Sequence, residues 1–310
     1  MESPAPAGWT LRVQARAVAA LACLLRLLPR RAVPSVGAFA GAVYGRLDRR
    51  RRRVALENLE RALGRELPRA ERTRIAERVF RHFGRAAFEM LTLDRYGASD
   101  AGTLIEYEGI EHIRAAYAAG RGAFLFSAHF GNWELVALMQ GYQGMPLAMI
   151  TRTLDNPLIE GFMRRRREAS GNQVVPKRNA IRQALRALGD GMGVAIVIDQ
   201  NVRAGARLFV DYFGTPASTT PTLALLALKT GAPIIPVFSY PGPGGSYRVV
   251  YGPPVPVETT GDRERDVRAL TERCTKIIEE QVRARPDLWL WMHARWKRRP
   301  RPTEWPPPAR

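Results

Sequence analysis

The chain has 310 residues, of which 46% are hydrophobic, so it is long and apolar enough for one large α/β domain or two smaller ones. Its 48 Lys and Arg residues outnumber its 29 Asp and Glu residues and give a formal net charge of +19. This excess implies an anionic partner such as nucleic acid, lipid headgroups, a phosphorylated substrate or an acidic protein. The only cysteines, Cys23 and Cys274, exclude a disulfide framework and a cysteine-based zinc site.

The N-terminal region contains two apolar stretches, at 17–25 and 32–45, divided by arginines and a proline at 26–31. Neither stretch has the ~18 uncharged residues of a clean transmembrane helix. Five arginines follow at Arg49–Arg53, and a polybasic segment beside an apolar anchor is attracted to anionic lipid on the cytoplasmic side. We therefore predict that residues 1–53 form a membrane-associating segment with a monotopic or marginally spanning anchor. The alternative is a buried core helix followed by a solvated basic turn.

The rest of the chain alternates between helical and strand-like patterns. Apolar spacing of three and four predicts helices over 54–92. Short apolar runs separated by helical segments then predict strands at 123–128, 147–153, 193–200, 232–240 and 247–255, before a long helix at 262–286. This alternation is typical of an α/β fold with a mostly parallel central sheet flanked by helices. We assign it to one domain at 54–300, followed by a flexible Pro-rich tail at 301–310.

One apolar strand ends in an unusual polar sequence, "FLFSAHFGNWE" at 124–134. His129 follows this strand, and Asp199 closes the strand predicted at 193–200. Because ligands of open α/β sheets bind beyond the carboxyl ends of the strands, we expect both side chains on the same rim. Asn132 is a good N-cap, which would place Glu134 in the first turn of the next helix.

A histidine with a carboxylate partner is suited to general base catalysis. The carboxylate fixes the tautomer and stabilises the imidazolium that forms when a hydroxyl proton is taken. The spacing of five residues between His129 and Glu134 lets the two side chains fold toward each other across a tight turn. No G-x-S-x-G nucleophile motif is present, so the base would activate the hydroxyl of the substrate itself. The alternative is that Glu134 only complements the helix dipole.

Several motifs in chain order resemble one family. The H-x-x-x-x-E pattern after an apolar strand resembles the glycerolipid acyltransferase superfamily, and "SAHFGNWE" is similar to the lipid A late acyltransferases within it. The same family is resembled by "RTLDNPLIEGFMRRRREASGN", "AIRQALRALGDGMGVAIVIDQN", "LFVDYFGTPASTTPTLALLALKTGAPIIPVF" and "RPDLWLWMHARWKRRP". The resemblance spans nearly the whole chain and implies transfer of an acyl chain from a thioester on acyl carrier protein to a hydroxyl of an anionic lipid A precursor.

The resemblance also implies roles for individual residues. His129 would be the general base and Glu134 its paired acid, while Asp199 would support the site. Arg167 would hold a phosphate, since a guanidinium matches phosphate oxygens. Secondary candidates for substrate contact are Arg152, Asn156 and Arg164. We further expect backbone N–H groups at 130–132 to stabilise the oxyanion.

The resemblance implies no metal or redox cofactor, and His82, His112 and His293 lack metal-ligand spacing. It places the enzyme on the cytoplasmic face of the bacterial inner membrane. Trp289, Trp291 and Trp296 are interpreted as core or interfacial aromatics.

Two other functions stay open at this point. The first is an acyltransferase for another glycolipid or aminolipid, which these motifs do not separate from a lipid A enzyme. The second is a basic, non-enzymatic protein that binds nucleic acid or membranes. The second would explain the net charge, but no helix-turn-helix, zinc-finger or RNP pattern is present, so we expect no nucleic-acid partner.

Overall fold

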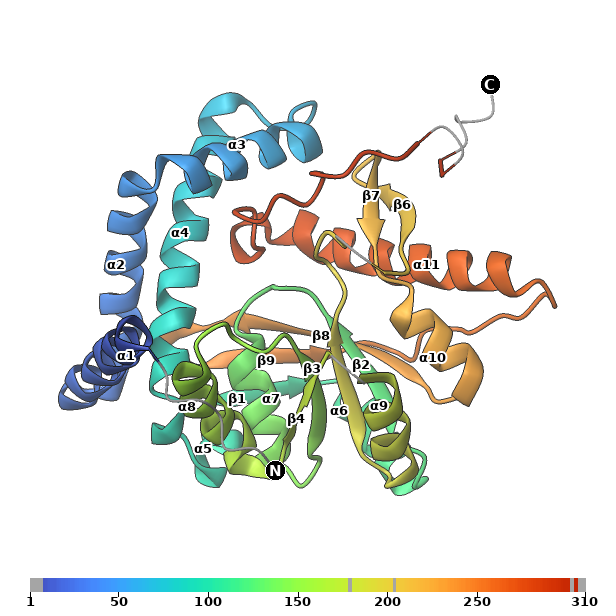
Figure 1. The fold of residues 1–310 in the computed structure, drawn as a ribbon, viewed down its shortest axis with the longest axis horizontal. Helices are drawn as coiled ribbons and strands as arrows, with labels where there is room; N and C mark the ends of the chain where they lie inside the picture. Colours follow the sequence, from blue (N-terminus) through green and yellow to red (C-terminus); the bar gives the residue numbers. More distant parts are fainter. Residues whose placement is uncertain (1–7, 178–179, 203–204, 302–303, 306–310) are drawn as a thin grey trace.

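A seven-stranded sheet lies at the centre of the computed structural model, which describes residues 8–177, 180–202, 205–301 and 304–305 (Figure 1). The strand order is β1-β9-β8-β2-β5-β3-β4. Only the β8–β9 pair is antiparallel in this sheet. The predicted α/β fold with a mostly parallel sheet is therefore confirmed. The strands are β1 (Ile105–Glu108), β2 (Ala123–Ser127), β3 (Leu147–Thr151), β4 (Gln173–Pro176), β5 (Gly193–Val197), β8 (Ile234–Pro241) and β9 (Tyr247–Tyr251).

The strand predictions were right for β2, β3, β5, β8 and β9, with ends that differ by a few residues. The strands β1 and β4, which have four residues each, were not predicted. Neither was the antiparallel hairpin made by β6 (Leu208–Tyr212) and β7 (Thr215–Thr219). Two residues connect these strands, and Phe213 has a φ of 57°, a left-handed conformation that a phenylalanine rarely adopts.

Helices cover both faces of the sheet. Along β2 the side chains alternate: Phe124 and Phe126 join one core cluster, whereas Ala123 and Leu125 join the other. A strand that is buried on both faces reads as a continuous apolar run, as the sequence shows. The helices after β1 are α6 (Ile110–Ala118), α7 (Trp133–Tyr142), α8 (Pro157–Arg167), α9 (Ala180–Gly189), α10 (Thr222–Thr230) and α11 (Arg263–Ala284). The sequence predicts that α9 begins at Arg178, and residues 178–179 lie outside the described part of the chain.

In the described part of the chain, five α-helices precede β1: α1 (Trp9–Leu27), α2 (Val33–Leu47), α3 (Arg49–Leu63), α4 (Arg69–Leu91) and α5 (Ala98–Thr103). Of these, α2 lies along α4 (Figure 1). The buried glycines Gly37, Gly41 and Gly45 face α4 at intervals of four residues. A Cβ atom at Gly41 would lie 2.1 Å from the carbonyl oxygen of Phe80. The two helices thus touch backbone to backbone, which only glycine permits.

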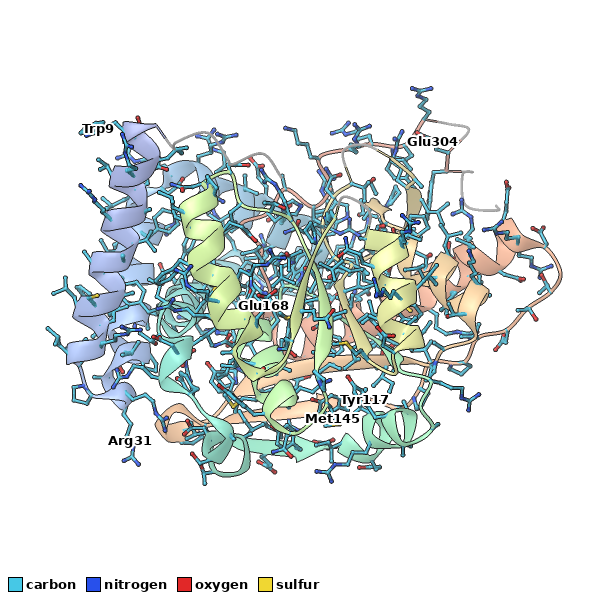
Figure 2. The ribbon with its side chains drawn as sticks, turned by 60° about the horizontal axis from the view of Figure 1, so that its bottom comes forward. Trp9, Arg31, Tyr117, Met145, Glu168 and Glu304 are labelled. Atoms are coloured by element: carbon cyan, nitrogen blue, oxygen red, sulfur yellow. The ribbon has the colours of Figure 1, made fainter. Side chains whose placement is uncertain are left out.

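Large apolar side chains point outward from α1 and α2. Trp9, Val13, Leu24 and Leu27 are exposed on α1, and at 3.6 residues per turn they fall on one stripe of the helix. Figure 2 shows Trp9 at the outer end of this helix. Among the described residues, no helix combines the length and the hydropathy needed to cross a bilayer. The structure therefore does not show the predicted anchor.

The proposed boundary between residues 53 and 54 falls inside a helix. α3 runs without interruption from Arg49 to Leu63, and Asp48 caps it by accepting a hydrogen bond from the N–H of Arg51 at 2.9 Å. The polybasic run is thus the exposed first turns of a helix whose later residues, Leu59 and Leu63, are buried in the core. Most of the predicted tail at 301–310 lies outside the described residues.

Candidate active site

His129 and Asp199 meet at the carboxyl edge of the sheet because their strands are neighbours in register. Ser127 of β2 pairs with Val197 of β5, and each functional residue follows its strand by two positions. Nδ1 of His129 lies 2.8 Å from Oδ1 of Asp199. The backbone N–H of His129 donates to Oδ2 of the same carboxylate at 2.9 Å. The expectation that both residues share one rim is confirmed.

The Asp199 carboxylate is almost completely buried and has three donors around it. Its side chain is 3% exposed, and the indole Nε1–H of Trp289 donates to Oδ2 at 2.8 Å. Burial alone would raise the pKa of Asp199, but the charge of a protonated His129 and the hydrogen bonds from His129 and Trp289 lower it to about 2. Asp199 is therefore an anion with one fixed orientation at neutral pH.

An ionised carboxylate accepts hydrogen bonds only, so Nδ1 of His129 carries the proton in this arrangement. The lone pair of the neutral ring is then on Nε2, the nitrogen that faces away from Asp199. The His129 side chain is 16% exposed, and its ring packs edge-on against Trp133 with centroids 5.0 Å apart. The side-chain amide nitrogen of Gln200 lies 3.1 Å from Nε2. His129 thus presents a lone pair of fixed direction, as a general base requires.

Glu134 lies in the first turn of α7, as predicted, but it pairs with Arg167 and not with His129. Nε and Nη2 of Arg167 donate to the two carboxylate oxygens at 2.8 and 2.7 Å. The expected His129–Glu134 pairing is therefore corrected. Asn132 caps α7, which begins at Trp133, and Glu134 contacts the last residue of α8. The partner of His129 is instead Asp199, because β2 and β5 are paired in register.

The Arg167–Glu134 pair is bidentate and mostly buried, with side-chain exposures of 11% and 10%. Burial lowers the pKa of Arg167, but its hydrogen bonds and charge attraction to Glu134 outweigh that effect and hold the pKa above its usual value. Nη1 of Arg167 is buried and has no hydrogen-bond partner in the part of the chain that the structure describes. This nitrogen of the guanidinium is therefore available as a hydrogen-bond donor to a ligand.

The backbone N–H groups at 130–132 are already used. Phe130 donates to the carbonyl of Ala128 at 2.7 Å, and Gly131 donates to the carbonyl of Leu288 at 3.0 Å. Asn132 donates to the hydroxyl oxygen of Ser239 at 2.8 Å. The expectation that these amides stabilise an oxyanion is corrected, because in this structure they fix the turn that carries the histidine.

A second set of buried polar groups holds the same turn from α4. Nε2 of His82 lies 3.1 Å from the carbonyl oxygen of Gly131 and donates to it. Burial lowers the pKa of His82 to about 4, so this ring is neutral at pH 7. The side-chain amide of Asn132 donates to the buried Glu89 at 2.9 Å. His82, for which the sequence indicated no function, thus connects α4 to the turn that carries His129.

The family model for "Bacterial lipid A biosynthesis acyltransferase" matches residues 9–298. The chain belongs to this family of acyltransferases. It is 27% identical to the "Lipid A biosynthesis lauroyltransferase" of Escherichia coli K12 over 275 residues, which cover 88% of each protein. It is 26% identical to the "Lipid A biosynthesis palmitoleoyltransferase" of the same organism, over 88% of this chain and 87% of that one. It is also 28% identical to the "Phosphatidylinositol mannoside acyltransferase" of Mycobacterium tuberculosis H37Rv, over 61% of this chain and 58% of the relative.

The three secondary candidates for substrate contact make structural contacts elsewhere in the fold. Oδ1 of Asn156 caps α8 through the N–H groups of Leu158 and Ile159, while its amide donates to the carbonyl of Leu11 on α1 at 2.8 Å. Arg152 is highly exposed and pairs with Asp155, three residues further on. Arg164 contacts Glu168 and the carbonyl of Val174. None of these contacts brings the three residues to His129.

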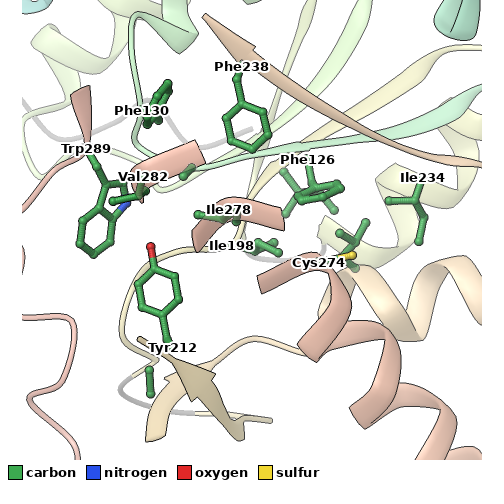
Figure 3. Packing of buried hydrophobic residues seen from close by; sticks show 14 of the residues in the cluster. Phe126, Phe130, Ile198, Tyr212, Ile234, Phe238, Cys274, Ile278, Val282 and Trp289 are labelled. Carbon is green, nitrogen blue, oxygen red and sulfur yellow. The ribbon is translucent and has the colours of Figure 1, made fainter. Parts of the chain in front are cut away.

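Two residues that the sequence did not connect with the site contact the His129–Asp199 pair. Trp289 is 1% exposed and lies in an aromatic cluster with Tyr212 and Trp291, as expected of a core residue. Figure 3 shows its ring near that of Tyr212. Its indole N–H also donates to Asp199. Gln200 contacts the other nitrogen of His129. Its position directly after Asp199 is the sequence signal that would have found it. Within the described ranges, no group of three or more His, Cys, Asp and Glu side chains is arranged to hold a metal ion.

Proposed function

We propose that this acyltransferase moves a fatty acyl chain from a thioester of acyl carrier protein to a hydroxyl of a lipid A precursor. The observation that supports it most is the buried Asp199, which holds His129 with its Nε2 lone pair turned away from the carboxylate. The family match over residues 9–298 gives the reaction type. The similarity to the lauroyltransferase and the palmitoleoyltransferase, over 88% of this chain, suggests the acceptor.

The reaction requires one proton acceptor and no covalent enzyme intermediate. Nε2 of His129 takes the proton of the acceptor hydroxyl as its oxygen attacks the thioester carbonyl carbon, and Asp199 stabilises the imidazolium. A C–O bond forms, the C–S bond breaks, and the imidazolium returns the proton to the departing thiolate. The N-terminus of α7 begins at Trp133 beside the imidazole, so its dipole and first N–H groups would stabilise the developing oxyanion.

The Arg167–Glu134 pair would act on the substrate. The unpartnered Nη1 of Arg167 is a donor for a phosphate oxygen of the lipid acceptor or of the phosphopantetheine arm. Glu134 would fix the plane of the guanidinium through its two hydrogen bonds. Its role would thus be to position Arg167, next to the helix turn that bears the catalytic histidine.

The N-terminal helices would hold the enzyme at the cytoplasmic face of the bacterial inner membrane. The exposed stripe of α1, with Trp9 and Leu27 at its two ends, suits a helix lying in the lipid interface. Exposed arginines at the start of α3 would be attracted to anionic headgroups. The remaining positive charge suits an acidic carrier protein and an anionic acceptor.

The test is acyl transfer by the purified protein in detergent, with acyl carrier protein thioesters of several chain lengths and a lipid A precursor. We expect transfer by wild type and a loss of ~10²–10⁴-fold in His129→Ala. His112→Ala is the matched control, because His112 lies on α6 and should leave the rate unchanged. Equal rates for wild type and His129→Ala would disprove the assigned base.

A second acceptor class is favoured by the similarity to the phosphatidylinositol mannoside acyltransferase. A phosphatidylinositol mannoside also carries sugar hydroxyl groups, from which His129 would take a proton in the same way. The assay therefore includes a phosphatidylinositol mannoside beside the lipid A precursor. Transfer to the mannoside alone would keep the acyltransferase mechanism and replace the acceptor.

A further inference from the structure

The lone pair that would accept the substrate proton is already occupied by a side chain of the protein. Nε2 of Gln200 lies 3.1 Å from Nε2 of His129. Because Asp199 keeps the proton of His129 on Nδ1, the ring nitrogen that faces Gln200 is an acceptor. An amide oxygen at that position would meet the lone pair with another lone pair, so the NH₂ group of Gln200 is the one that donates.

The residues on either side of Gln200 are held by hydrogen bonds, whereas the Gln200 side chain makes no hydrogen bond to them. Asp199 is held by His129 and Trp289. The backbone N–H of Asn201 donates to Nε2 of His293 at 3.0 Å. The Gln200 side chain is partly buried and, among the described residues, its only hydrogen bond is the one to His129. Rotation about the side-chain bonds of Gln200 alone would therefore expose the lone pair of His129.

We propose that Gln200 is a cap on the catalytic base, which the acceptor hydroxyl displaces when it binds. This inference rests on the proposed function. An amide N–H is far too weak an acid to give its proton to imidazole, so the capped state is stable and unreactive. The amide occupies the position of the acceptor O–H and keeps water from that position. Gln200 thereby favours transfer to the lipid over hydrolysis of the acyl donor.

The reaction that the cap suppresses is hydrolysis of the acyl donor. Nε2 of His129 would take a proton from water, and the water oxygen would form a C–O bond with the thioester carbonyl. The C–S bond would then break, and the thiolate would receive the proton from the imidazolium. The products would be a free fatty acid and the carrier thiol. Removal of the cap should therefore raise hydrolysis in the absence of acceptor and leave the chemistry of transfer available.

Two variants separate the hydrogen bond from the bulk of the side chain. Gln200→Leu keeps a similar volume without the amide, and Gln200→Ala removes both. Without acceptor, we expect each variant to hydrolyse the acyl carrier protein thioester roughly three- to tenfold faster than wild type, the range of one net neutral hydrogen bond. Gln173→Leu makes the same change at an exposed site on β4 and should match wild type.

A second readout does not depend on turnover. Diethylpyrocarbonate acylates an imidazole nitrogen that has a free lone pair, and peptide mass spectrometry reports the rate at each histidine. Modification of His129 should be at least threefold faster in both Gln200 variants, with His112 as the internal reference. Circular dichroism confirms that each variant is folded.

Faster hydrolysis and faster His129 modification in both variants would support the cap. An increase in Gln200→Ala alone would overturn it, because steric cover and not the amide would then protect the base. Unchanged rates in both variants would overturn it as well. If wild type transferred to no acceptor, the proposed function would fail, but the modification rates would still test whether Gln200 covers His129.

Discussion

The rim of the sheet that carries His129 and the N-terminal helix pair are built in opposite ways. At the rim, His129 and Asp199 sit among hydrogen bonds that fix both the carboxylate and the turn. The pair α1–α2 has glycines against α4 and large apolar side chains facing outward. The first region depends on atomic positions, whereas the second depends on close backbone contact and apolar area. A single substitution should therefore have a large effect at the rim and a small effect on the outer helix faces.

The largest effect on stability is expected at the rim, through the buried His82. Its pKa is about 4 in the folded protein and near 6.5 when unfolded, so the unfolded chain binds more protons between these values. The free energy of unfolding should therefore fall by ~3 kcal/mol as the pH drops from 6.5 to 4. Urea denaturation across this range should show the loss in wild type and little of it in His82→Gln.

His112→Gln is the control for this experiment, because His112 is only partly buried on α6. It should keep the full acid sensitivity of the wild type. If His82→Gln were as acid-sensitive as wild type, the connection between α4 and the turn that carries His129 through a neutral His82 would be wrong.

A smaller loss of stability is expected where α2 crosses α4. In Gly41→Ala the new Cβ would lie 2.1 Å from the carbonyl oxygen of Phe80, so the helices must separate. We expect a loss of ~1–3 kcal/mol, as for other overpacked contacts. Gly102→Ala on α5 is matched, because its Cβ would meet no atom within 4 Å, and it should raise the stability by up to ~1 kcal/mol. Equal effects of the two changes in thermal or urea unfolding would refute the close contact.

The smallest effect should come from the outward faces of the helix pair. Phe39 is 66% exposed on α2, and Phe39→Ser should weaken binding to vesicles of phosphatidylethanolamine and phosphatidylglycerol about tenfold, by loss of apolar contact area. Ile181→Ser changes a residue that is 56% exposed on α9 and should leave vesicle binding unchanged. Flotation of the vesicles measures both, and equal binding by both variants and wild type would exclude this face from lipid contact.

The sequence predicted which residues lie at the rim of the sheet more accurately than it predicted which side chains pair there. Short apolar runs located β2 and β5, and the rule that parallel strands end on one edge predicted that His129 and Asp199 share one rim. The sequence contains no direct signal that β2 and β5 are neighbours in register. The acid five residues away therefore looked like a better partner than the acid 70 residues away, and Glu134 was assigned to His129 instead of Arg167.

Two further features were not predicted from the sequence, namely the hydrogen bonds of the amides at 130–132 and the β6–β7 hairpin. The amides at 130–132 look available in a sequence, because their acceptors include Leu288 and Ser239, which come from distant parts of the chain. The β6–β7 hairpin was missed because its turn uses Phe213 in a left-handed conformation rather than a two-residue turn signal such as Asn-Gly. Contacts between segments that are distant in the sequence thus determine features that local sequence patterns do not predict.

The measurement that tests the central claim most directly compares Asp199→Asn with Glu134→Gln in acyl transfer to the lipid A precursor. If Asp199 is the partner of the base, Asp199→Asn should lower kcat by ~10³-fold with little change in the acceptor KM. Glu134→Gln should mainly raise the acceptor KM, because it loosens Arg167. A large kcat loss in Glu134→Gln together with near-normal turnover by Asp199→Asn would contradict the account and restore Glu134 as the partner of His129.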